Sequence, residues 1–137
     1  MGALFTNQGQ CTGGVIHLSP QEAYADLERG ALLVDVREDY LVSMKAFAVP
    51  GVIELPFSRF ASDCDSLPRD RPLILADAVG LYSREAATLL LARGFTEVAS
   101  LNGGISRWED EHLPLQVDPA NLLQGGCACR LRPGRPG

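Results

Sequence analysis

Short apolar blocks alternate with polar segments along the chain, and this pattern predicts strands and helices that follow one another. The blocks with strand character cover residues 15–18, 32–36, 51–55, 73–76 and 98–101. The segments with helical character cover residues 20–29, 56–67, 84–93 and 105–112. Such an alternation is typical of a parallel sheet with helices on both faces. We therefore expect an α/β fold with three layers and a central parallel sheet of about five strands.

The first predicted helix has the clearest boundaries. Ser19 is a suitable N-cap, Pro20 suits the first helical position, and Glu22 completes a capping box. Gly30 is expected to end this helix. Residues 37–50 are expected to form a loop with some helical content.

The chain divides into three segments. Residues 1–14 are expected to be a polar lead-in, residues 15–116 to form one domain, and residues 117–137 to be a flexible tail rich in Gly, Pro and Arg. A chain of 137 residues fits this single domain.

Composition and charge exclude several classes of function. The net charge is −5, which disfavours nucleic acid as a partner because phosphate contacts need clustered cations. No apolar run approaches the roughly 18 residues that a membrane helix needs. The first 14 residues show no secretory signal, so we expect a cytoplasmic protein with no membrane partner.

The most informative segment is the loop 77–83, which follows the apolar run 73–76. A strand that leads through a tight, glycine-containing loop into a helix directs N–H groups and the helix dipole at an anion. Such a loop holds a phosphate-like ligand or a nucleophile that reacts as an anion. Its seven residues are Asp77, Ala78, Val79, Gly80, Leu81, Tyr82 and Ser83. The sequence therefore predicts an anion-binding loop that itself begins with a carboxylate.

Three parts of the chain resemble signatures of the rhodanese-like (sulfurtransferase) domain family. They are residues 33–38 (LVDVRE) with 49–52 (VPGV) and 55–56 (LP), residues 73–95, and residues 101–105 (LNGGI) with Trp108 and 113–114 (LP). The resemblance implies the rhodanese-like fold and a relationship to thiosulfate sulfurtransferase.

The resemblance also assigns roles to loop positions. In that family the loop usually begins with a cysteine that carries sulfur as a persulfide, and an arginine five residues later helps to hold an anionic donor. Here these positions are Asp77 and Tyr82, and Ser83 matches the serine or threonine that follows. Either the Asp77 carboxylate is a built-in anion that blocks or mimics a ligand, or it only caps the N–H groups of a loop freed from catalysis. An aspartyl-phosphate role lacks support because Val79, two residues later, is not an aspartate.

Residues near the loop have structural interpretations. Tyr82 is expected to pack over the loop, and Arg84 to be a solvated residue of the first helical turn. Asp35 and Arg37 are expected to form a structural pair beside the loop.

The histidines and two of the cysteines also have structural interpretations. His17 is expected to be a strand or core residue rather than a base, and His112 to be a cation at the C-terminal end of the last helix. Cys11 is expected in a linker, and Cys64 in a loop or short helix, where a catalytic role is the less favoured alternative.

Cys127 and Cys129 are the other candidates for sulfur chemistry. They follow a Gly-Gly pair and precede Arg130, whose charge favours the reactive thiolate. Either they carry sulfur or bind a soft metal in place of a loop cysteine, or they are incidental residues of the tail. The chain has no paired CxxC groups, and we expect no metal site and no cofactor.

Two functions follow from these alternatives. The first is a rhodanese-like protein without loop-cysteine sulfur transfer, which acts as a binding or regulatory module for a small anion or a protein partner at the loop 77–83. The second is a sulfurtransferase or sulfur relay that uses Cys127 and Cys129 with a sulfur donor or acceptor protein.

Overall fold

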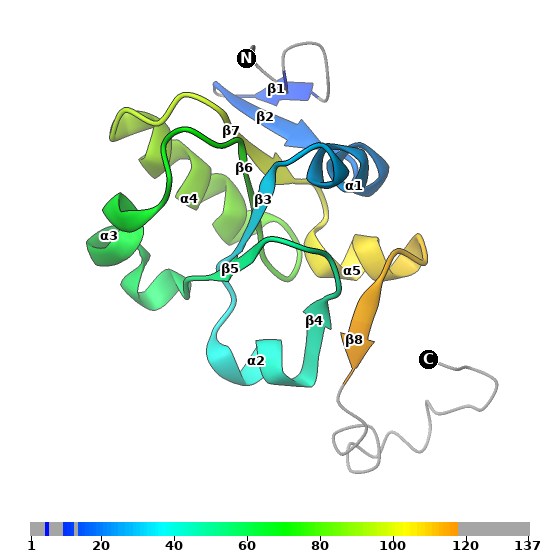
Figure 1. The fold of residues 1–137 in the computed structure, drawn as a ribbon. Coiled ribbons are helices and arrows are strands. Elements are labelled where there is room, and N and C mark those ends of the chain that lie inside the picture. Colours follow the sequence, from blue (N-terminus) through cyan, green and yellow to red (C-terminus); the bar gives the residue numbers. More distant parts are fainter. Residues whose placement is uncertain (1–4, 6–9, 13, 118–137) are drawn as a thin grey trace, which may run out of the picture.

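A central sheet of six strands organises the computed structural model, which describes Phe5, residues 10–12 and residues 14–117 (Figure 1). Across the sheet the order is β1 (Gln10–Thr12), β2 (Val15–Leu18), β7 (Val98–Leu101), β6 (Leu73–Ala76), β3 (Leu32–Asp35) and β5 (Val52–Glu54). The five strands from β2 to β5 are mutually parallel, and this confirms the predicted sheet. The additional strand β1 pairs antiparallel with β2. The expectation of a lead-in over residues 1–14 missed this strand, which contains Cys11.

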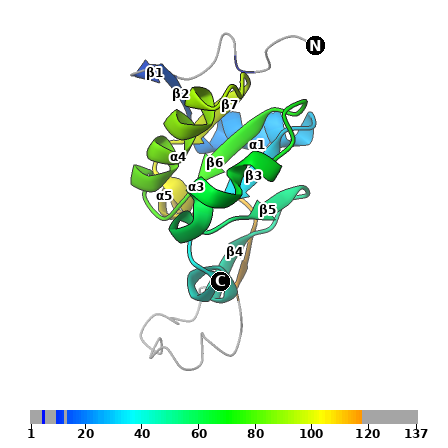
Figure 2. The same cartoon turned by 90° about the vertical axis from the view of Figure 1, so that its left-hand side faces the viewer.

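Helices cover both faces of the sheet. The helices α3 (Phe60–Asp63) and α4 (Leu81–Ala92) lie on the face turned toward the viewer in Figure 2, and α1 (Pro20–Glu28) and α5 (Gly104–Asp110) lie on the other. Side chains of a strand alternate between the two faces. In β3, Val34 joins the apolar cluster of α4, and Leu33 joins the cluster of α1 and α5. Two apolar cores therefore sandwich one sheet.

The predicted boundaries of α1 are confirmed. The Ser19 hydroxyl accepts a hydrogen bond from the Glu22 N–H at 3.1 Å, and the Glu22 carboxylate accepts one from the Ser19 N–H at 2.9 Å. Gly30 follows the helix with a φ of +111°, which glycine adopts without strain.

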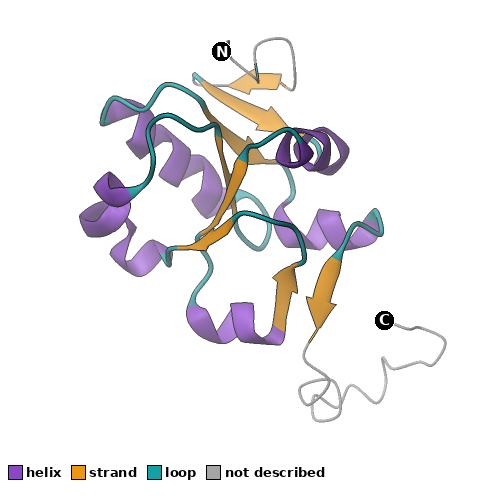
Figure 3. Ribbon diagram, viewed as in Figure 1, coloured by secondary structure: helices purple, strands orange, loops and turns teal. Residues whose placement is uncertain are grey.

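A second, smaller sheet lies beyond the carboxyl ends of the parallel strands (Figure 3). It pairs β4 (Lys45–Phe47) antiparallel with β8 (Leu115–Val117), and the helix α2 (Asp39–Met44) leads into it. The helical content expected within residues 37–50 is therefore present, but β4 was not predicted. Val117 belongs to β8, whereas the sequence placed it at the start of the tail.

Three other helical segments differ in detail from the prediction. Residues 56–67 form the single turns η1 (Phe57–Arg59) and η2 (Cys64–Ser66) on either side of α3. The helix α4 begins three residues earlier than predicted, so Leu81, Tyr82 and Ser83 form its first turn. His112 is not in the last helix, because α5 ends at Asp110 and His112 has a φ of +60° in the following turn. Within the described ranges, no helix has the length and apolar character of a membrane-spanning segment.

Candidate functional site

The loop 77–83 begins where β6 leaves the middle of the parallel sheet. All four residues of β6 are buried, and β6 pairs with β7 on one side and β3 on the other. Gly80 has a φ of +105°, which allows the chain to turn directly into α4. The loop therefore sits at the carboxyl edge of the sheet, the usual position of ligand sites in open α/β sheets.

The carboxylate of Asp77 occupies the inside of this loop. The residue is only 2% exposed. One carboxylate oxygen accepts a hydrogen bond from the Gly80 N–H at 2.5 Å, and the other accepts bonds from the N–H groups of Tyr82 at 2.7 Å and Ser83 at 3.3 Å. These are the N–H groups that an external anion would use. The loop thus binds an anion that belongs to the chain itself.

A serine pair supports the floor of the loop. The Ser83 hydroxyl lies 2.9 Å from the hydroxyl of Ser100 in β7, and it also donates to the Gly80 carbonyl at 3.3 Å. Both serines are buried. Ser100 was not identified from the sequence. The available signal was a polar residue within the buried strand 98–101, since a buried hydroxyl needs a partner.

The N-terminal turn of α5 packs directly against the loop. The Ile105 N–H donates to the Asp77 carbonyl at 2.9 Å, and the Ser106 N–H donates to the Ala78 carbonyl at 3.1 Å. A Cβ atom on Gly104 would lie 2.5 Å from the Ala78 carbonyl group. Glycine at this position therefore permits the close approach that holds the loop in place.

The outer surface of the loop is apolar. Val79 is 58% exposed, Leu81 64% and Tyr82 55%. The Tyr82 ring lies 4.8 Å from the ring of Phe57, measured between centroids. Tyr82 thus packs at the rim, as expected, against a residue that the sequence analysis did not select. Arg84 is exposed on α4, as expected.

Asp35 and Arg37 form the expected pair beside the loop. The guanidinium donates to both carboxylate oxygens, at 3.0 Å from Nε and 2.8 Å from Nη2, and both side chains are buried. Arg37 also donates to the Lys45 carbonyl at 2.9 Å. Asp35 is in register with Ala76, the residue before Asp77. This pair therefore joins the strand beside the loop to β4.

His17 lies in β2, in register with Ser100 of β7, so its expected place in a strand is confirmed. Its Nε2 atom is buried and has no hydrogen-bond partner among the described residues. Burial, with a contribution from Arg84, lowers the pKa of His17. The imidazole is therefore neutral at neutral pH.

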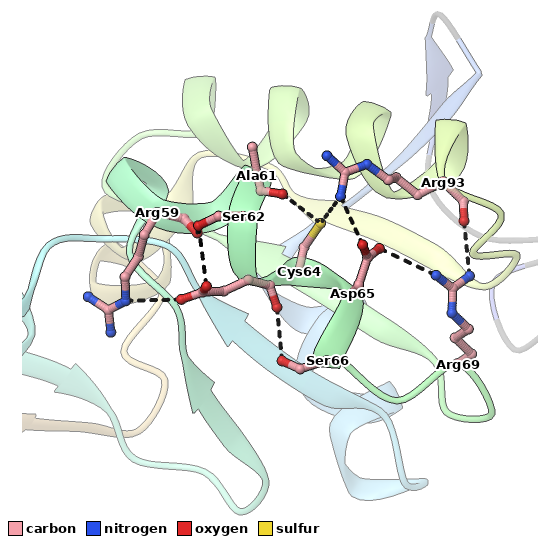
Figure 4. A network of polar contacts seen from close by, with 9 residues as sticks. Arg59, Ala61, Ser62, Cys64, Asp65, Ser66, Arg69 and Arg93 are labelled. Atoms are coloured by element: carbon pink, nitrogen blue, oxygen red, sulfur yellow. Dashed lines mark hydrogen bonds and ion pairs between the residues drawn. The ribbon is translucent and has the colours of Figure 1, made fainter.

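Cys64 lies at the start of η2, in the polar network of Figure 4, and is fully buried. Its sulfur accepts a hydrogen bond from Arg93 Nη1 at 3.4 Å, and the same nitrogen lies 3.3 Å from the Asp65 carboxylate. Burial raises the pKa of the Cys64 thiol, and the charge of Arg93 opposes that shift in part. A buried, protonated thiol is unreactive, so this geometry agrees with a structural role.

Cys127 and Cys129 lie outside the described residues. Among the described residues, no group of three or more His, Cys, Asp or Glu side chains is arranged to hold a metal ion.

The fold and the loop together define a class of protein: an α/β domain that holds an anion at a strand–helix turn in the middle of a parallel sheet. Residues 19–111 match the family model described as "Rhodanese-like domain". The chain belongs to the rhodanese-like domain family.

Comparisons with individual proteins agree with this assignment. The chain is 31% identical over 101 residues to thiosulfate sulfurtransferase GlpE of Haemophilus influenzae. This alignment covers 73% of this chain and 93% of that protein. It is 32% identical over 108 residues to GlpE of Pseudomonas syringae, covering 79% of this chain and 94% of the relative.

Solved structures resemble the fold. The rhodanese-related protein of Thermoplasma volcanium aligns with a TM-score of 0.67 at 22% identity, over 74% of this chain and 98% of that chain. A rhodanese-like domain protein of Staphylococcus aureus aligns with a TM-score of 0.63 at 22% identity, over 74% and 97%.

Proposed function

We propose that this protein is a rhodanese-like binding or regulatory module that does not transfer sulfur through its loop. The observation that carries the proposal is the Asp77 carboxylate, which accepts three hydrogen bonds from the loop N–H groups. A carboxylate oxygen cannot become a persulfide, and the loop 77–83 contains no cysteine. The proposal takes Asp77 as the counterpart of the family's sulfur-carrying cysteine and Tyr82 as the counterpart of its anion-binding arginine. We also propose that the protein is cytoplasmic.

A protein partner suits this loop better than a small anion. An external anion would have to displace the Asp77 carboxylate from its three N–H donors. The outer surface instead offers apolar contact area through Val79, Leu81 and Tyr82. Exposed apolar side chains that gather at one place are typical of protein-binding surfaces.

The sulfurtransferases among the relatives support a second candidate, in which Cys127 and Cys129 carry sulfur between a donor and an acceptor protein. One experiment separates the two functions: thiosulfate-to-cyanide sulfur transfer, with the persulfide on each cysteine measured by mass spectrometry. We expect no turnover and no persulfide. Persulfide on Cys127 or Cys129, with activity that is lost when both are changed to serine, would establish the second function instead.

The double variant Asp77→Cys with Tyr82→Arg should gain weak sulfur transfer. It introduces a polarisable nucleophile inside the loop 77–83 and a cation at the rim of the loop. The N–H groups inside the loop favour the thiolate form of the new cysteine. The assay again measures sulfur transfer from thiosulfate to cyanide. The matched control is Asp77→Ser with Tyr82→Arg, which has the same loop but no thiol at position 77. If the folded cysteine variant accepts no sulfur, the loop does not have the shape required for this chemistry.

The variant Asp77→Ala should open the loop to external anions. Loss of the Asp77 carboxylate leaves buried N–H groups unpaired. Each unpaired group costs about 1–3 kcal/mol, so the melting temperature should fall. Thiosulfate or phosphate should then stabilise the variant, by about 1.4 kcal/mol at ten times its Kd, and leave the wild type unchanged. Thermal melts with and without the anion measure this.

Asp77→Asn provides the control, because its amide oxygen still accepts hydrogen bonds inside the loop. It should lose less stability than Asp77→Ala and respond less to the anion. If thiosulfate stabilised the wild type and Asp77→Ala equally, the wild-type loop would bind a small anion despite the Asp77 carboxylate.

A further inference from the structure

The helix α2 and the small sheet of β4 and β8 lie beyond the carboxyl ends of the parallel strands (Figure 1). Residues of these elements and the end of β5 line a groove. Its volume is about 490 Å³, within the range of ligand-binding pockets. We call it the α2–β8 groove, and its lining includes Asp39, Val42, Ala46, Glu54, Gln116 and Val117. The loop 77–83 and this groove therefore share one edge of the molecule.

The groove carries negative charge that its surroundings do not neutralise. Asp39 and Glu54 are both exposed, and neither forms a hydrogen bond or ion pair through its carboxylate within the described part of the chain. The nearby cations have other partners. Arg37 is paired with Asp35, and Lys45 with Glu109 at 2.5 Å. An occupant of this groove is accordingly expected to be cationic.

The chain itself continues from the wall of the groove. Val117, the last residue of β8, lines it, and residues 118–137 follow. After Asp118 this segment contains no acidic residue, and it carries Arg130, Arg132 and Arg135. Arg130 is the thirteenth residue after Val117, and a chain of that length can span on the order of 40 Å, so it can turn back to the groove.

We propose that the arginine-containing segment 130–135 of the same chain docks in the α2–β8 groove. In this docked arrangement the arginines pair with the carboxylates of Asp39 and Glu54, and the apolar stems of their side chains cover the partly exposed Ala46 and Val117. Attachment to β8 holds the segment at an effective concentration on the order of millimolar, so weak contacts are sufficient for docking. The inference is independent of the proposed function, which depends on the loop.

Disulfide trapping in the full-length protein tests this docking. Ser43 lines the groove, and Cys129 directly precedes Arg130. In the variant Ser43→Cys, mild oxidation with diamide joins the new thiol to Cys127 or Cys129 only when their Cα atoms come within about 7 Å. The matched control is Thr88→Cys on α4, which is also exposed but lies outside the groove. Peptide mapping by mass spectrometry measures the yield of each intramolecular disulfide.

We expect the yield from Ser43→Cys to exceed that from Thr88→Cys on the order of tenfold, reflecting the higher local concentration. Adding Asp39→Asn and Glu54→Gln should remove most of that excess, and so should 1 M salt, which shortens the Debye length to about 3 Å. Changing the three arginines to glutamine should have the same effect with the groove left intact.

Three results would overturn the proposal. They are equal yields at positions 43 and 88, a yield at position 43 that does not respond to removal of the charges, and disulfides that form only between two chains. Circular dichroism melts of each variant establish that it is folded before oxidation.

Discussion

Replacing Gly104 with alanine is expected to lower the free energy of unfolding by about 3–5 kcal/mol, through left-handed backbone strain, steric overlap and lost hydrogen bonds. Gly104 has a φ of +60°, and a Cβ there would lie 2.5 Å from the backbone of Asp77 and Ala78. These atoms are the carbonyl groups that Ile105 and Ser106 bond. The added methyl group therefore has to push the loop away from α5 and weaken both bonds. Chemical denaturation measures the loss.

Gly30→Ala is the matched control for this variant. Gly30 also has a positive φ, of +111°, but a Cβ there would meet no atom within 4 Å. Gly30→Ala should therefore lower the free energy of unfolding only by the backbone strain, about 1–2 kcal/mol. If Gly104→Ala lost no more than Gly30→Ala, the close packing of the loop on α5 would not contribute to stability. The geometry of the Asp77 site would then need another explanation.

Removing Asp35 is the second large effect that we expect. Asp35→Ala should cost about 3–5 kcal/mol, because it leaves the buried Arg37 guanidinium without its counter-charge. Asp35 accepts two side-chain hydrogen bonds from Arg37, and its Oδ1 atom also accepts the Arg37 N–H at 3.1 Å. Equilibrium unfolding of the variant measures the loss. The strand next to the loop should loosen with it, because Asp35 is in register with Ala76.

The exposed pair of Arg59 and Asp63 provides the comparison. Its atoms lie 3.3 Å apart, and both side chains are about half exposed. Asp63→Ala should therefore change stability by no more than about 1 kcal/mol. The double variant Asp35→Leu with Arg37→Met should lose much less than Asp35→Ala, because it removes both charges together. If Asp35→Ala and Asp63→Ala had equal effects, burial of the Asp35–Arg37 pair would be energetically unimportant.

The sequence was most informative where neighbours along the chain determine the structure. The capping box of Ser19 and Glu22 lies within one helical turn, and the apolar runs of β6 and β7 were located to the residue. The pairing of β4 with β8 was missed because Ala46 and its partner Gln116 are far apart in sequence. Neither segment has a local pattern that reveals the other.

The candidate site shows the same division. A strand, a glycine-containing loop and a helix indicated an anion-binding loop, and the family signatures indicated the rhodanese-like class. The partners of the loop were not apparent, because Ser100, Phe57 and Gly104 come from three other segments of the chain. A contact between segments depends on how the sheet and its helices pack.

By itself, the sequence determined the α/β class, the parallel strands and the carboxylate at the start of the loop, since each depends on residue type and local spacing. Two alternatives for Asp77 remained open at that stage, a built-in anion or a simple cap. Only the tertiary structure decided where the carboxylate lies. Gly80 turns the backbone, α5 holds the loop closed, and the N–H groups of Gly80, Tyr82 and Ser83 then converge on the buried Asp77 side chain. That convergence requires packing across the sheet, because no single segment holds the loop in this shape.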